Sequence, residues 1–142
     1  MFNPTRQQAR QFFIDAWRKA CSSELLTPME DLAARVVALH PEYHALLAQG
    51  EAALEREWTV EGGQSNPFMH LSLHLAIEEQ LQIDQPPGLR AAFEAQCTRL
   101  QDRHAALHIV LEALGETLWQ SQRSAQPPDG AAYLARVKRG LI

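Results

Sequence analysis

Apolar residues recur at spacings of three and four along most of the chain, and this is the period of an amphipathic α-helix. Leu32, Val36 and Val37, for example, share one helical face. The pattern predicts longer helices at about 4–21, 28–39 and 67–82. A further helical stretch begins at Leu89, falters near Gln101-Asp102 and runs on to about Arg123. Shorter helices are expected at 41–48, within 50–58 and at 130–139. No stretch alternates apolar and polar residues long enough to indicate a strand. The chain is therefore predicted to form an all-α, four-helix-type bundle with additional short helices, as a single domain over 1–142.

Capping and turn signals divide these helices. Asn3-Pro4 and Asn66-Pro67 each place an N-cap residue before a proline at the first helical position. Thr27-Pro-Met-Glu30 is a capping-box pattern. A helix is expected to end at His40, because the residue before a proline is disfavoured in the helical region. Gln126-Pro-Pro-Asp-Gly130 resembles the earlier Gln85-Pro-Pro-Gly88, and both runs should interrupt helices.

Composition and charge remove several classes of function. The formal net charge is −4, with 46% hydrophobic and 21% charged residues, which is ordinary for a globular protein. An acidic chain has no general attraction for nucleic acid or for anionic lipid, so neither nucleic acid nor membrane is an expected partner. No apolar run is long enough for a membrane span, and no secretory signal is visible, so a cytoplasmic location is expected. Cys21 and Cys97 lack metal or redox spacing and are predicted to be reduced core residues.

The histidines carry the clearest chemical signal. Histidine, histidine and glutamate occur at i, i+4 and i+8 in two predicted helices, as His70, His74 and Glu78 and again as His104, His108 and Glu112. Residues at this spacing drift slowly around one helix face, so each helix should present a row of metal-ligand side chains among buried Leu and Ile residues. Two rows facing each other would form a site for a transition-metal ion, with Zn, Fe and Mn as candidates and one or two ions per chain.

The spacing limits how each row can bind metal. His70 and Glu78 are separated by roughly 12 Å along the helix axis, so one row cannot place all three side chains on one ion. A mononuclear site would use one histidine pair and a further ligand. A dinuclear site would need bridging carboxylates, for which Glu78 and Glu112 are candidates. His40 and His44 form a third pair across Pro41, and one of them, preferably His44, is expected to supply an additional ligand.

Two classes of function follow from these residues, and the catalytic residues are not identified. The first is a metal-dependent hydrolase or an oxygen or redox enzyme with an unknown small-molecule substrate. The second is a non-enzymatic interaction or regulatory module whose histidines form a buried polar layer and whose apolar helices supply a homodimer interface. Protonation of clustered histidines near pH 6 would be a third use of the same residues. The chain has no phosphate-binding Gly-rich loop and no His-Glu-x-x-His pattern.

Several motifs together resemble one protein family. They are Met1-Phe-Asn-Pro, His40-Pro-Glu-Tyr-His, Asn66-Pro-Phe-Met-His-Leu-Ser-Leu-His-Leu-Ala-Ile-Glu-Glu-Gln, Asp84-Gln-Pro-Pro-Gly and Pro127-Pro-Asp-Gly. The family consists of small proteobacterial proteins catalogued as a domain of unknown function, and the resemblance covers essentially the whole chain. It implies a bacterial protein and transfers no activity.

A more distant resemblance is to the DinB-like and hemerythrin-like metal-binding helical bundles. The DinB-like pattern implies that His44 would join His104 and His108 on one ion. The hemerythrin-like His-x-x-x-Glu pattern is present as His74-Glu78 and as His108-Glu112. The duplicated row departs from both groups, so the resemblance concerns fold and ligand type and not a reaction.

Overall fold

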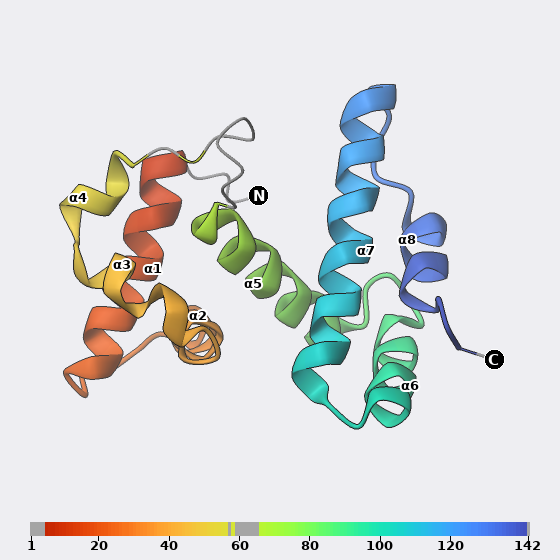
Figure 1. The fold of residues 1–142 in the computed structure, drawn as a ribbon, viewed down its shortest axis with the longest axis horizontal. Coiled ribbons are helices and arrows are strands. Elements are labelled where there is room, and N and C mark those ends of the chain that lie inside the picture. The colour runs from red at the N-terminus through yellow and green to blue at the C-terminus, as the bar shows by residue number, and fades with distance from the viewer. Residues whose placement is uncertain (1–4, 57, 59–65, 142) are drawn as a thin grey trace. The chain divides into compact units, whose positions relative to one another are not determined.

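The computed structural model describes residues 5–56, 58 and 66–141, and all regular elements in these residues are helical. The helices are α1 (Arg6–Cys21), α2 (Pro28–Ala38), the 3-10 helix η1 (Pro41–Tyr43), α3 (His44–Ala48), α4 (Glu51–Leu54), α5 (Pro67–Ile83), α6 (Leu89–Leu100), α7 (Arg103–Ser124) and α8 (Gly130–Val137) (Figure 1). The described residues contain no strand, which confirms the all-α prediction.

The chain divides into two compact units, Met1–Leu75 and Ala76–Ile142, and the boundary falls inside α5. The sequence gives no sign of this boundary, because apolar residues keep their helical spacing through α5 and no stretch rich in polar residues, Gly or Pro marks a linker there. The expectation of a single domain over 1–142 stays a prediction.

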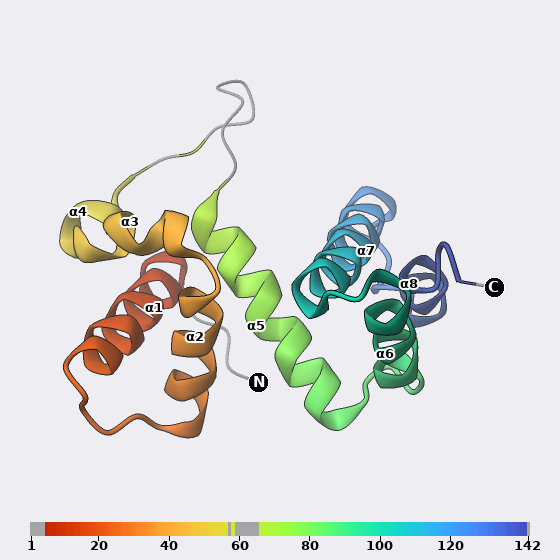
Figure 2. The ribbon, with the colours of Figure 1, turned by 60° about the horizontal axis from the view of Figure 1, so that its bottom comes forward.

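The first unit is built on α1, which packs against α2, α3 and α4. Figure 2 shows α1 and α2 side by side, joined by a short connection. The core of the unit includes Phe13, Val37, Leu47, Phe68 and Leu71, each less than a tenth exposed. Because Phe68 and Leu71 belong to α5, their burial fixes the first turns of that helix against the rest of the unit.

Capping boxes begin both long helices of the N-terminal half. The Thr5 side chain accepts a hydrogen bond from the Gln8 amide, and the Gln8 side chain accepts one from the Thr5 amide. Thr27 and Glu30 form the same reciprocal pair before α2, as predicted. The predicted helix start at Asn3-Pro4 lies outside the described residues. Within them, α1 begins at Arg6, where Thr5 and Gln8 satisfy its first amides.

Removing the Thr27 cap tests this account of α2. Thr27→Ala should lower the free energy of unfolding by about 1 kcal/mol, because the Glu30 amide loses its acceptor at a helix end. Urea denaturation followed by tryptophan fluorescence would measure the change. Ser22→Ala, an exposed position at the other end of the α1–α2 connection, should change it by less than about 0.5 kcal/mol. Equal losses in both variants would contradict a specific role for the cap.

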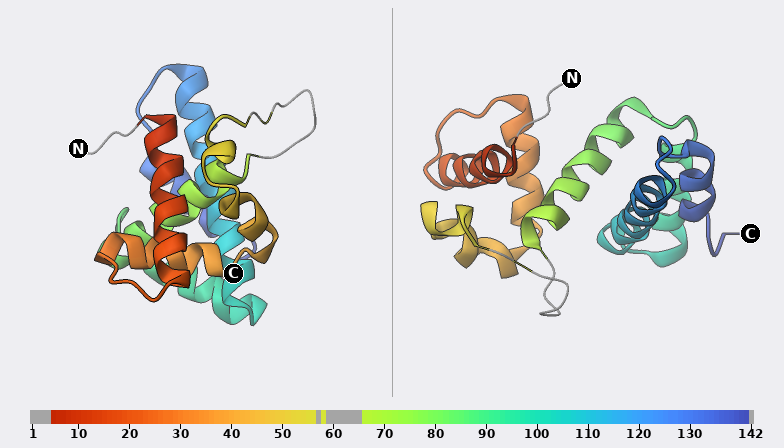
Figure 3. Two further views of the ribbon diagram at one scale, coloured as in Figure 1. Left: turned by 90° about the vertical axis from the view of Figure 1, so that its left-hand side faces the viewer. Right: turned by 90° about the horizontal axis from the view of Figure 1, so that it is seen from above.

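The second unit is formed by α6, α7 and α8, which pack against one another (Figure 3). Leu89, Leu107, Val110 and Val137 are fully buried among them. The buried Gln96 amide donates to the carbonyls of Val137 (2.7 Å) and Arg139 (2.8 Å), so it ties the C-terminal end of α8 to α6. These contacts satisfy carbonyls that a helix end leaves without internal partners.

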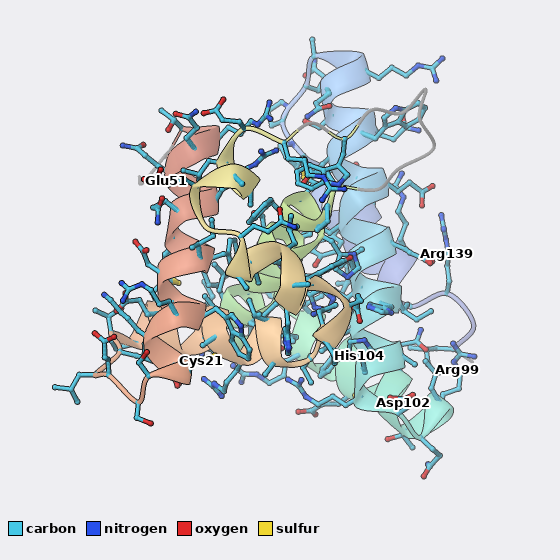
Figure 4. All side chains as sticks on the ribbon, turned by 60° about the vertical axis from the view of Figure 1, so that its left-hand side comes forward. Cys21, Glu51, Arg99, Asp102, His104 and Arg139 are labelled. Atoms are coloured by element: carbon cyan, nitrogen blue, oxygen red, sulfur yellow. The ribbon has the colours of Figure 1, made fainter. Side chains whose placement is uncertain are left out.

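The cysteine prediction is half right. Both cysteines are free thiols, as expected, but neither belongs to the core. Cys21 is exposed because it is the last residue of α1 (Figure 4), and Cys97 is half-buried. Burial raises the pKa of the Cys97 thiol, so this group stays protonated at neutral pH. Among the described residues, no helix combines the length and the apolar character needed to cross a bilayer.

Candidate metal centre

Three histidines gather in the first unit. His40, His70 and His74 each offer a ring nitrogen, and these nitrogens lie within 4.8 Å of one another. The ring centroids are 4.9 Å apart for His40 and His70, 4.6 Å for His40 and His74, and 4.8 Å for His70 and His74. His40 is 2% exposed and His74 is fully buried. The group therefore lies inside the protein, with His70 at its more accessible edge.

Two different elements position these rings. His70 and His74 are one turn apart on α5, so they project from the same face of the helix. Asn66 caps this helix, since its side-chain oxygen accepts hydrogen bonds from the amides of Phe68 and Met69. His40 follows the end of α2 with φ −127° and ψ 68°, a non-helical conformation, in line with the exclusion of the helical region before Pro41. The proline therefore ends α2 where the chain has to turn His40 toward α5.

The hydrogen bonding of His40 selects the nitrogen that can bind a metal. Its Nδ1 lies 2.8 Å from the Val36 carbonyl oxygen, which can only accept, so Nδ1 carries the proton and donates. In the neutral ring Nε2 then has a lone pair, the form in which imidazole binds a metal. Nε2 of His40 is 3.1 Å from Nε2 of His70. Ligand nitrogens about 2.05 Å from a tetrahedral zinc would be roughly 3.3 Å apart, which is close to this separation.

Tyr43 borders the three rings. Its ring lies nearly parallel to His40, at 5° with centroids 5.4 Å apart, and 5.9 Å from the ring of His70. Burial raises the pKa of the Tyr43 phenol, and Glu42 adds to the shift, so the hydroxyl stays protonated at neutral pH. The residue can therefore donate a hydrogen bond at the edge of the group without adding charge.

His44 lies outside this group. Its ring stacks on Trp17, with centroids 4.4 Å apart, and its Nε2 is 2.9 Å from the Val37 carbonyl oxygen. The structure thus places His40 beside His70 and His74. The sequence had favoured His44 over His40 as the additional ligand. The physical reason is η1, which separates the two residues, so that they share no helix face.

The second predicted row lies on α7, in the second unit. His104 and His108 are neighbours, with ring centroids 4.3 Å apart, and Asp102 caps the start of the helix by accepting from the His104 amide (Figure 4). Glu112 is exposed, while Glu78, at the second-unit end of α5, forms an ion pair with Arg103 at 3.4 Å. His70 and His74 belong to the first unit, and His104 and His108 to the second. The expectation that the two rows meet in one site stays a prediction.

Comparison with known proteins gives one match. The profile of the family described as Domain of unknown function (DUF1841) matches residues 5–139. The chain belongs to the DUF1841 family. No curated protein and no solved structure matches it. The resemblance inferred from the Asn-Pro, His-Pro and Pro-Pro motifs is confirmed, and it brings to this DUF1841 chain neither a substrate nor a cofactor.

The residues present fit a transition-metal ion. Three imidazole nitrogens are a typical donor set for Zn or Fe, whereas Mn prefers carboxylate and water oxygens, and no carboxylate of the described part of the first unit joins the group. In this DUF1841 chain, the spacing of His70 and His74 predicted both as metal ligands. The sequence favoured His44 over His40 as the additional ligand. The only signal in favour of His40 was Pro41, which directs the residue before it away from the helix.

Proposed function

We propose that this DUF1841 protein binds one transition-metal ion, Zn or Fe, through His40, His70 and His74, and that the ion has an open coordination position for a hydrolytic or oxygen-dependent reaction. One observation carries the proposal: three imidazoles from two elements, two of them buried, place ligand nitrogens within 4.8 Å of one another. Imidazole nitrogens gathered in this way are a donor set that suits a transition-metal ion.

Known chemistry supports a catalytic use of such a site. Catalytic zinc sites have three protein ligands and keep one position for water or substrate, whereas structural sites use four. A metal ion bound here would lower the pKa of a coordinated water or bind oxygen, according to its identity. The chain itself supplies the Val36 carbonyl, which fixes the His40 tautomer, and Tyr43, whose ring lies beside that of His70 and whose phenol is protonated.

Elemental analysis tests the proposal. The full chain should be purified without a histidine tag or chelator and measured by mass spectrometry of its metals. We expect about one Zn or Fe per chain, and its identity would choose between hydrolytic and redox assays. Binding should also raise the melting temperature, since a ligand that binds only the folded state stabilises it. A metal-free protein that takes up neither Zn nor Fe(II) on titration would contradict the proposal.

A non-enzymatic polar layer is the second candidate, and the same 3.1 Å separation supports it. With Nδ1 of His40 donating to Val36, a proton on Nε2 of His70 could be donated directly to Nε2 of His40. The two candidates then differ in the tautomer of His70, because metal binding through Nε2 requires the ring proton to lie on Nδ1. Nitrogen-15 NMR of the imidazole rings would measure the tautomer. A His70 proton that moves from Nε2 to Nδ1 when Zn is added would favour the metal centre. No uptake of metal and a proton that stays on Nε2 would favour the polar layer.

A further inference from the structure

A cavity of about 550 Å³ lies in the second unit, between the C-terminal half of α7 and α8. Its volume falls in the range of small-molecule sites, roughly 300–1,000 Å³. The turn Gln126-Pro-Pro-Asp-Gly130 forms part of its wall through Gln126, Pro127 and Asp129. This turn packs against the similar earlier turn, because a Cβ added at Gly130 would lie 3.7 Å from Cβ of Pro86. The second of these turns therefore lines the cavity and packs against the first turn, and neither turn takes part in the histidine group.

The hydroxyl groups that line this cavity can only accept hydrogen bonds from a ligand. Each hydroxyl hydrogen is already donated within the chain, from Thr117 to the Ala113 carbonyl, from Ser121 to the Gln126 carbonyl and from Ser124 to the Gln120 carbonyl. A hydroxyl has one hydrogen and two lone pairs, so the oxygens remain as acceptors. The Asp129 carboxylate, which caps α8 through the Ala132 amide, adds further acceptor capacity. A ligand therefore has to bring donors such as hydroxyl or amino groups.

Arg136 gives the cavity a positive charge. Its side chain is 17% exposed, its Nη1 donates to Thr117 Oγ1 at 2.8 Å, and its Nε lies 3.6 Å from Glu116. Glu116 also pairs with Arg139 at 3.0 Å, so two guanidinium groups share one carboxylate and one net positive charge remains. A guanidinium has five N–H groups in a planar fork that suits carboxylate and phosphate oxygens.

The charges lie at opposite ends of α8. Asp129 and Arg136 are seven residues apart, which corresponds to about 10 Å along the helix axis at 1.5 Å per residue. A ligand that used both would carry its anionic group near Arg136 and its hydrogen-bond donors along the hydroxyls toward Asp129. We propose that this cavity binds a small polyhydroxylated or amino-bearing molecule with one oxyanion group, a carboxylate or a phosphate. The proposal does not depend on the histidine group, because every residue that carries it belongs to the second unit.

Titration calorimetry of the full chain with four matched probes tests the proposal. D-Glucose 6-phosphate and D-gluconate combine hydroxyls with a phosphate or a carboxylate, D-glucose has hydroxyls alone, and inorganic phosphate is an oxyanion alone. We expect at least one of the first two to bind tenfold or more tightly than both of the others, and to shift the Ala132 amide in NMR spectra. Whichever of these two probes binds more tightly identifies the preferred oxyanion as a phosphate or a carboxylate. If neither binds more tightly than glucose and phosphate, the proposal is wrong.

Variants locate the binding. Arg136→Gln should weaken the better probe at least tenfold, whereas Arg123→Gln removes the same charge from an exposed position of α7 outside the cavity and should leave binding unchanged. Should Arg136→Gln unfold, Ser124→Phe serves instead, because it fills the cavity from an exposed position. Undiminished binding in a folded Arg136→Gln or Ser124→Phe variant would overturn the proposal.

Discussion

His74→Ala is expected to abolish metal binding by the first unit. His74 is fully buried, and its ring lies 4.6 Å from that of His40 and 4.8 Å from that of His70. The metal affinity should fall by more than roughly 100-fold. Removing a residue that only orients a metal ligand costs up to about 100-fold, and removing the ligand itself should cost more. Competition with a chromophoric chelator would measure the affinity, and circular dichroism would confirm that the variant stays helical.

His44→Ala is the matched control for this variant. It removes the same side chain from the same unit, but His44 stacks on Trp17 and lies outside the group. We expect its metal affinity to stay within about threefold of the parent, which is less than 1 kcal/mol, with some loss of stability from the missing ring contact. Should His74→Ala fail to fold, the half-buried His70 gives a second variant with the same expected loss. Metal retained in both ligand variants, or lost equally in His44→Ala, would exclude the proposed ligands.

The same measurement tests the expected contribution of α7. If the two His-His-Glu rows share one site, as the sequence predicts, His108→Ala should weaken binding, and a second ion would raise the stoichiometry above one. If the first unit binds alone, the affinity of His108→Ala should equal that of the parent. Glu112, exposed in the second unit, serves as a further comparison, since Glu112→Gln should matter only for a dinuclear site bridged by carboxylates.

Local sequence rules predicted the parts of the candidate site that depend on a single helix. The spacing of His70 and His74 places both rings on one face of α5, and Asn66-Pro67 marks the start of that helix. Both features are set by residues within one or two turns. For the same reason the capping box at Thr27 and the turn at Asp84 could be predicted before any packing was known.

The remaining features depend on contacts between residues distant in sequence. His40 and His44 have equal chemistry and similar spacing. Only the contact of His40 with α5 and the packing of α1 against α3 decide which ring meets His70 and which meets Trp17. Glu78 fits the ligand pattern, yet the approach of Arg103 gives it an ion pair. In the cavity beside Arg136, backbone carbonyls accept the hydroxyl hydrogens of Thr117, Ser121 and Ser124, and backbone groups have no residue type to detect.

Arg10→Met is expected to give the largest loss of stability in the first unit. Arg10 is 2% exposed, and its Nη1 donates to the carbonyls of Leu54 (2.9 Å), Arg56 (2.8 Å) and Ala53 (3.3 Å). These carbonyls lie at the C-terminal end of α4 and just beyond it, where a helix leaves carbonyls without intrahelical partners. Met has a similar length but no donor, so these buried and part-buried acceptors lose the Arg10 hydrogen bonds at a cost of about 3 kcal/mol. Urea denaturation followed by the fluorescence of Trp17 and Trp58 would measure the change.

Arg6→Met is the control for this loss, because Arg6 lies one turn earlier on α1 and donates to the same Arg56 carbonyl from an exposed position. Water can replace that donor, so the cost should stay below about 1 kcal/mol. Arg10→Lys should fall between the two, since one ammonium cannot reproduce the guanidinium fork. The Arg10 guanidinium also lies 5.1 Å from the ring centroid of Phe68, two residues before His70. Arg10→Met should therefore weaken metal binding as well as folding, whereas an equal loss of stability in Arg6→Met would contradict the role of burial.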